Sequence, residues 1–144
     1  MDKPPKAFED SEFLQSPEGR SVRILSEYEK VKSMFEFHKI MDTITFFGSA
    51  RFKSKEENYS SNEIDIENSE YYEQARSLAF KFATWAKEFS KNHNRFVIAT
   101  GGGPGIMEAA NRGAIEAKGK SIGLGIRLPQ EQKNNQYLSL IHIR

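Results

Sequence analysis

Apolar residues recur along the chain at two kinds of spacing, and these predict helices that alternate with short strands. Steps of three and four residues indicate amphipathic helices, whereas short β-branched and aromatic runs indicate strands. The predicted helices are 21–35, 69–91 and 105–118, and the predicted strands are 44–47, 96–98 and 121–126. This alternation predicts an α/β fold, a Rossmann-like parallel sheet with flanking helices and right-handed crossovers.

Two segments lack this patterning. Residues 1–20 are polar and contain three prolines, which predicts a disordered N-terminal arm. Residues 52–68 are charged and polar, which predicts a loop. Residues 21–144, which include this loop, are long enough for one modest domain. The buried face of the helix at 69–91 is expected to comprise Tyr72, Ala75, Leu78, Ala79, Phe82, Ala86 and Phe89.

Composition excludes several classes of function. The 21 basic and 20 acidic side chains give a net charge of +1, so nothing indicates binding to a nucleic acid polymer. The chain has no cysteine, and its three histidines are scattered, so we expect neither a disulfide framework nor a metal site. It also lacks an apolar run long enough to span a membrane, so we expect a soluble, cytoplasmic protein.

A glycine turn joins the second predicted strand to the helix that follows it. Gly101, Gly102 and Gly103 precede Pro104 and Gly105, where the helix begins. A strand, a bare turn and a helix start bring backbone N–H groups and the positive end of a helix dipole together, which favours a phosphate. The alternative is that the glycines only form a tight turn. The spacing fits neither the dinucleotide fingerprint nor the P-loop.

A second small-residue turn, 48–51, follows the first predicted strand. Ser49 offers a hydroxyl, and Arg51 a forked cation suited to phosphate; the alternative is a plain turn with a solvated arginine. Glu108 and Asn111 lie in the first two turns of the helix after Gly105, where they could reach a ligand or simply be solvated. Because parallel strands end at one edge, these junctions and a third near Arg127 should converge on one rim.

Three blocks together resemble the LOG (Lonely guy) family, once labelled possible lysine decarboxylases. They are Phe47–Arg51, Thr100–Ala114 and Leu128–Gln132, within a similarity that covers about residues 23–137. The resemblance implies a Rossmann-like fold, a homodimer and no organic cofactor. It further implies hydrolysis of the N-glycosidic bond of nucleoside 5′-monophosphates, either AMP or cytokinin riboside monophosphates, to free base and ribose 5-phosphate.

The same resemblance implies the site residues. Glu131 matches an acidic position that contacts substrate in relatives, so it is the expected catalytic residue within the chain. The expected substrate-binding residues are Gly48, Ser49, Ala50, Arg51, Gly101, Gly102, Gly103, Gly105, Met107, Glu108 and Asn111. Replacing Gly102 with Val is then expected to weaken AMP binding with little change in melting temperature.

The chain also departs from the family pattern. The 52–68 loop is longer than in most relatives, and the signature P-G-G-x-G-T-x-x-E and the arginine before it do not occur. We therefore expect 21–144 to be the N-terminal, truncated part of a LOG-type domain, with the main catalytic Arg and Glu beyond residue 144. Residues 138–144 are expected to be non-native, and the 144-residue chain to be an inactive fragment. The competing hypothesis is a non-hydrolytic nucleotide- or cofactor-binding module.

Overall fold

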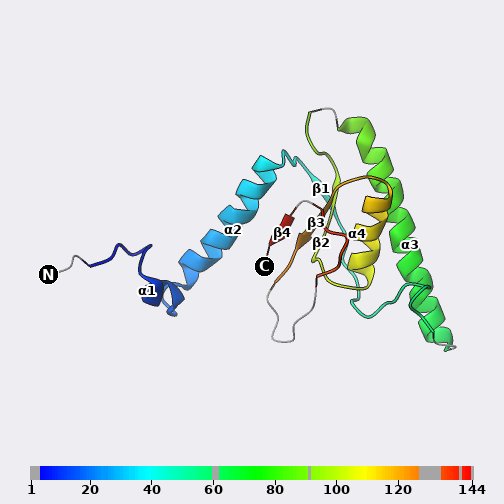
Figure 1. Cartoon of the computed structure of the whole chain (residues 1–144), viewed down its shortest axis with the longest axis horizontal. Helices are drawn as coiled ribbons and strands as arrows, with labels where there is room; N and C mark the ends of the chain where they lie inside the picture. Colours follow the sequence, from blue (N-terminus) through cyan, green and yellow to red (C-terminus); the bar gives the residue numbers. More distant parts are fainter. Residues whose placement is uncertain (1–3, 60–61, 91, 127–133, 140, 144) are drawn as a thin grey trace. The chain divides into compact units, whose positions relative to one another are not determined.

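The chain divides into two compact units, Met1–Phe37 and His38–Arg144 (Figure 1). The computed structural model describes residues 4–59, 62–90, 92–126, 134–139 and 141–143.

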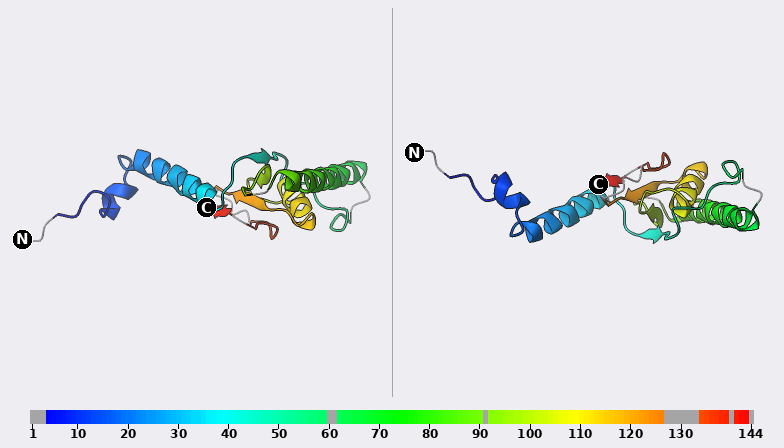
Figure 2. Two further views of the ribbon diagram at one scale, coloured as in Figure 1. Left: turned by 90° about the horizontal axis from the view of Figure 1, so that it is seen from above. Right: turned by 90° about the horizontal axis from the view of Figure 1, so that it is seen from below.

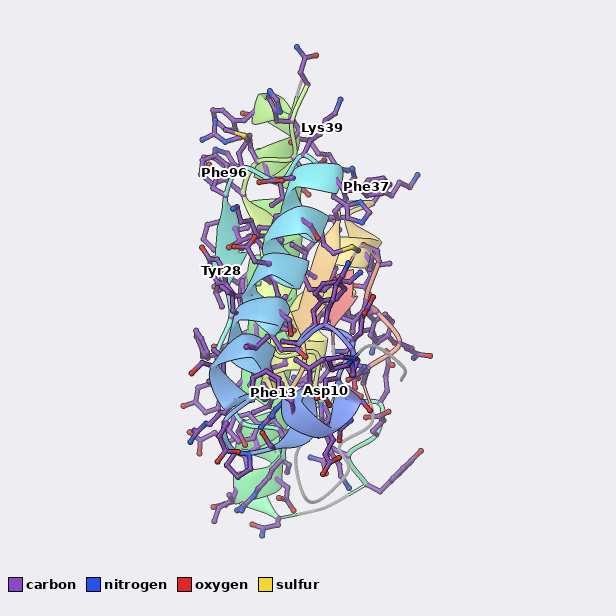
Figure 3. All side chains as sticks on the ribbon, turned by 90° about the vertical axis from the view of Figure 1, so that its left-hand side faces the viewer. Asp10, Phe13, Tyr28, Phe37, Lys39 and Phe96 are labelled. Carbon is purple, nitrogen blue, oxygen red and sulfur yellow. The ribbon has the colours of Figure 1, made fainter. Side chains whose placement is uncertain are left out.

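The first unit contains helices α1 (Ser11–Gln15) and α2 (Arg20–Phe37). Helix α1 lies in the segment for which the sequence predicts a disordered arm. It forms because the Asp10 carboxylate accepts a hydrogen bond of 3.0 Å from the N–H of Phe13, which caps the first turn (Figure 3). No residue of α2 is buried, and Tyr28 on its apolar stripe is 64% exposed.

The second unit is a four-stranded parallel sheet in the order β1-β2-β3-β4. Its elements in chain order are β1 (Thr43–Thr45), α3 (Glu63–Ala86), the 3-10 helix η1 (Lys87–Phe89), β2 (Val97–Thr100), α4 (Ile106–Glu116), β3 (Ser121–Leu124) and β4 (Ile141–Ile143). The predicted α/β, Rossmann-like parallel sheet with flanking helices is confirmed.

Helix α3 begins at Glu63, earlier than the sequence pattern predicts. The side chain of Asn62 accepts a hydrogen bond of 3.1 Å from the N–H of Ile64, and acidic Glu63 and Asp65 occupy the first turn. An Asn cap followed by acidic residues stabilises the positive end of the helix dipole. The prediction of a loop over 52–68 is therefore wrong for its last residues, because local capping starts the helix before its apolar stripe.

Helices α3 and α4 pack side by side on one face of the sheet (Figure 2). Strands that advance in one direction across a sheet, joined by right-handed crossovers, place their helices on the same face. The core is built mainly of small side chains around Ile98: Ala79, Ala83, Ala110, Ala114 and Ala117. Tyr72 is also buried, whereas Leu78 and Phe89 of the predicted buried face are 47% and 46% exposed.

Candidate functional site

The carboxyl ends of β1 and β2 bring two of the predicted turns together. Thr45 pairs with Ala99, and the N–H of Phe46 donates a hydrogen bond of 2.9 Å to the carbonyl of Ala99. The strands therefore end in register, and the segments that follow them leave from the same edge of the sheet. The third predicted junction, near Arg127, lies outside the described residues.

The turn after β1 packs directly on the start of α4. The N–H of Ile106 donates a hydrogen bond of 3.0 Å to the carbonyl of Ser49. Gly105 has a φ of +72°, and a Cβ placed there would lie 2.2 Å from the same carbonyl oxygen. A Cβ on Gly48 would lie 2.4 Å from Cγ2 of Ile106. Both glycines are thus needed for the close approach of the two turns.

Several backbone N–H groups near the meeting of the two turns have no partner among the described residues. Within the part of the chain that the structure describes, the N–H groups of Gly103, Gly105, Met107 and Glu108 have no hydrogen-bond acceptor. Helix α4 begins at Ile106, so its first N–H groups have no intrahelical partner, and they carry the positive end of the helix dipole. The arrangement can accept an anion through backbone groups alone.

Behind these donors, Asn111 is fully buried and its amide is used inside the protein. Its Oδ1 accepts a hydrogen bond of 2.7 Å from the Thr100 hydroxyl, which in turn accepts one of 2.9 Å from the N–H of Gly102. Its Nδ2 donates a hydrogen bond of 2.6 Å to the hydroxyl of Ser121 on β3. Asn111 therefore connects α4, β2 and β3 beneath the glycine turn.

Asn135 is a further member of this cluster, and sequence reasoning missed it. Its Nδ2 lies 3.1 Å from the carbonyl oxygen of Gly102, 2.9 Å from that of Gly103 and 2.9 Å from Oδ1 of Asn111. Its partners are 24 to 33 residues away in the chain, so no local spacing points to them. The residue lies outside every helix and strand, and only the fold brings it to the turn.

The carboxylate of Glu108 is engaged between the two helices. The hydroxyl of Tyr72, which is 1% exposed, donates a hydrogen bond of 3.0 Å to Oε1 of Glu108. Burial and the nearby negative charge of Glu108 raise the pKa of Tyr72 above its ordinary value. This pair links α3 to the first turn of α4, so the side chain of Glu108 supports the helix start that carries the unpaired donors.

The remaining predicted residues differ in what they contact. The hydroxyl of Ser49 accepts a hydrogen bond of 3.2 Å from the N–H of Arg51. Ala50 and Met107 are partly exposed. Arg51 itself is exposed. Glu131 lies outside the described residues.

In the part of the chain that the structure describes, no group of three or more His, Asp or Glu side chains is placed to hold a metal ion. None of the helices described there is long and apolar enough to cross a membrane.

The three consecutive glycines are not equivalent. Gly101 is exposed, and a Cβ there would meet only the flexible Sδ of Met107 at 3.1 Å. Gly102 is buried with a φ of +75°, and a Cβ there would lie 3.4 Å from Cδ1 of Leu138 and 3.5 Å from Cα of Gly123. The expectation that Gly102→Val changes the melting temperature little is therefore wrong, because a β-branched residue is strained at positive φ.

A known protein family matches the second half of the chain. The family model described as LDcluster4, the SLOG cluster4 family, matches residues 72–143, which is half of the 144-residue chain. The matched region contains the glycine turn, α4 and Asn135, whereas the 48–51 turn precedes it. No curated protein is similar enough to the chain to count as a match.

Proposed function

The chain belongs to the SLOG cluster4 family, and we propose that the intact protein binds a nucleoside 5′-monophosphate and hydrolyses its N-glycosidic bond. SLOG membership indicates a nucleotide-related function and ligand, on an enzyme-like fold. The SLOG superfamily includes LOG-like proteins, and the sequence blocks at 47–51, 100–114 and 128–132 support the narrower assignment to LOG-type chemistry.

One observation carries this proposal: the four N–H groups of Gly103, Gly105, Met107 and Glu108 that have no acceptor among the described residues. A phosphate monoester offers several strong acceptor oxygens and a negative charge, and a helix N-terminus complements both. We assign the phosphate group to these donors. The Ser49 hydroxyl and the Arg51 guanidinium, on the adjoining turn, are assigned to the ribose and phosphate oxygens.

In the proposed reaction, a water oxygen forms a bond to C1′ of the ribose while the bond from C1′ to the base nitrogen breaks. The base leaves with a proton, and ribose 5-phosphate is released. Glu131 is assigned to orient or deprotonate the water, a role that needs a carboxylate within hydrogen-bond reach. The LOG resemblance assigns no organic cofactor to this reaction and a homodimer to the active protein.

Binding without hydrolysis is the second candidate, and the geometry of Glu108 favours it. This carboxylate lies in the first turn of α4, but it accepts the hydrogen bond of the buried Tyr72 hydroxyl. The described residues therefore supply N–H donors without an acceptor among them, whereas the carboxylate nearest to these donors in sequence is used for packing. A nucleotide- or cofactor-binding module needs only the donors.

Titration calorimetry with AMP, ribose 5-phosphate and adenosine tests where the ligand is recognised. The proposal predicts that AMP and ribose 5-phosphate bind, and that adenosine, which lacks the phosphate, binds at least about tenfold more weakly, a loss of about 1.4 kcal/mol. Equal affinity for adenosine and AMP would place recognition on the base and overturn the phosphate assignment.

Release of free adenine from AMP, followed by chromatography, separates the two candidates. In the intact protein, Glu131→Gln is expected to reduce turnover by about 10²–10⁴-fold, the usual contribution of a general base, with the same melting temperature. If AMP binds and no adenine is released, the protein is the non-hydrolytic nucleotide-binding module. Unchanged kinetics in the Glu131→Gln variant would remove this residue from the mechanism.

A further inference from the structure

We propose that Asn135 is the positioning residue that holds the glycine turn in the form that presents its N–H groups to a phosphate. This inference rests on the proposed phosphate site. Asn135 is buried, and its side-chain amide contacts two consecutive carbonyls of the turn, those of Gly102 and Gly103.

The orientation of one peptide unit follows from these contacts. A trans peptide is planar, so its C=O and the next N–H point in opposite directions. Asn135 contacts the carbonyl oxygen of Gly102 with two donors. Its backbone N–H donates a hydrogen bond of 2.9 Å to this oxygen, and its Nδ2 lies 3.1 Å from the same atom. With that carbonyl fixed on the protein side, the N–H of Gly103 faces away from Asn135.

The rest of the cluster fixes which way the Asn135 amide is turned. The Asn111 atom that faces the carbonyl oxygen of Ile122, at 3.4 Å, must be the donor Nδ2, so the atom that takes the hydrogen of the Thr100 hydroxyl is Oδ1. Oδ1 of Asn111 is then an acceptor, and the Asn135 atom 2.9 Å away must be the donor, Nδ2. Oδ1 of Asn135 accepts the N–H of Tyr137 at 3.0 Å. Every polar atom of this amide thus has a partner.

Replacing Asn135 with aspartate is the most direct test, since aspartate has the shape of asparagine but no side-chain N–H donor at neutral pH. In Asn135→Asp, a carboxylate oxygen would face three acceptor oxygens, those of Gly102, Gly103 and Asn111. The turn can relieve this repulsion only by rotating its peptides, which displaces the N–H of Gly103. The side chain itself need not touch the ligand for binding to be lost.

Two measurements on the 144-residue chain test the proposal. The first is the affinity for AMP, which Asn135→Asp is expected to lower by about tenfold to a hundredfold through displaced charge-assisted donors. The second is amide hydrogen exchange in the ligand-free protein, which should accelerate at Gly102 and Asn135, whose N–H groups are hydrogen-bonded in the cluster, while Ile98 and Ile122 keep their protection. Asn92→Asp, the same change at an exposed site, is the matched control and should leave both unchanged.

The second variant, Asn135→Ala, removes the donors without adding charge and should give the same pattern with a smaller effect. Affinity within twofold of the original chain, or unchanged exchange at the turn, would overturn the positioning role. Uniform loss of protection at Ile98 and Ile122 in both variants would also overturn it, by showing that Asn135 serves the whole fold. If the unsubstituted chain fails to bind AMP, the assignment of the phosphate to the donors of this chain alone fails, whereas unchanged exchange at the turn in both variants overturns the role of Asn135 by itself.

Discussion

The start of α4 and the polar cluster directly behind it differ in how far their hydrogen-bonding groups are paired among the described residues. At the helix start, the N–H groups of Gly103, Gly105, Met107 and Glu108 have no acceptor in the described structure. In the cluster, Thr100, Asn111, Ser121 and Asn135 are all buried, and no buried side-chain nitrogen or oxygen among the described residues lacks a partner.

If Asn135 positions the glycine turn as proposed, the orientation of the unpaired N–H groups depends on the buried polar cluster. A glycine turn has many accessible conformations, and most of them would rotate its peptides away from a single direction. Thr100 and Asn135 use up the groups of the turn that face the protein, namely the N–H of Gly102 and the carbonyls of Gly102 and Gly103. In the proposed phosphate site, the N–H groups that remain are oriented before any ligand arrives.

The largest effect is expected from removing the centre of the cluster. Asn111→Leu has no polar atom and leaves Thr100, Ser121 and Asn135 without their shared partner. Because each buried group left unpaired costs about 1–3 kcal/mol, we expect the free energy of unfolding to fall by about 3–5 kcal/mol. Urea denaturation measures this, with Asn92→Leu at an exposed position as the control. A loss below about 1 kcal/mol would contradict the view that the cluster holds the fold.

A smaller loss is expected where α4 crosses α3. A Cβ on Gly113 would lie 2.1 Å from the carbonyl oxygen of Arg76, which belongs to the backbone of α3 and cannot move alone. Gly113→Ala gains about 0.8–1 kcal/mol of helix propensity. Overpacking costs about 1–3 kcal/mol, and this backbone clash lies at the upper end, so thermal unfolding should show net destabilisation. A higher melting temperature for Gly113→Ala would contradict this, because it would mean that α3 and α4 can move apart at no cost in the free energy of unfolding.

The next prediction separates binding from stability at the turn. Gly101→Val places a branched side chain at an exposed position with ordinary φ, where it meets only the end of Met107. We expect the free energy of unfolding to change by less than about 0.5 kcal/mol, as at other surface sites. AMP affinity should fall by about tenfold or more, because the side chain obstructs the approach to the donors. Equal affinity by calorimetry would place the ligand elsewhere.

The smallest effect concerns the ion pairs on the outer side of the two helices. Arg76 binds Glu116 through two hydrogen bonds of 2.8 and 2.6 Å, and Arg112 donates to the same carboxylate at 3.1 Å. Hydrogen bonds from Arg76 in particular lower the pKa of Glu116 below its ordinary 4.5, against the opposing effect of burial. This contribution to stability is present above pH 4.5 and disappears as the pH falls through the lower folded value.

Glu116→Gln should therefore lower the unfolding free energy modestly above pH 4.5 and change it little at the most acid pH, which flattens the acid side of the plot of unfolding free energy against pH. The effect is modest because the Glu116 side chain is 36% exposed, and exposed ion pairs are screened by water. Chemical denaturation at several pH values between about 3 and 7 measures it, across the range in which a carboxylate titrates. An identical pH profile for the variant and the original chain would show that the pairs contribute nothing.

Much of the fold followed from local chemistry. The apolar runs placed β1, β2 and β3, and the alternation with helices predicted the parallel Rossmann-like sheet, because parallel strands require crossovers. The glycine turn at 101–103 was identified from its position between a strand and a helix, and the neighbouring 48–51 turn from the end of β1. Helix capping by Asp10 and Asn62 is also local, but each cap consists of a single hydrogen bond. The apolar spacing, from which the helices were predicted, does not reveal it.

The sequence by itself determined most of the helices and strands and the glycine turn at the start of α4, since these depend on neighbours within a few residues, and the alternation of helices and strands predicted the parallel sheet. It predicted neither α1 nor β4. Only the tertiary structure decided that Asn111 points inward, that Tyr72 takes the carboxylate of Glu108 and that Asn135 closes the cluster. Each of these depends on a partner 11 to 36 residues away. A buried polar side chain must find a partner, but which one it finds is set by the packing of the strands and helices that bring the two together.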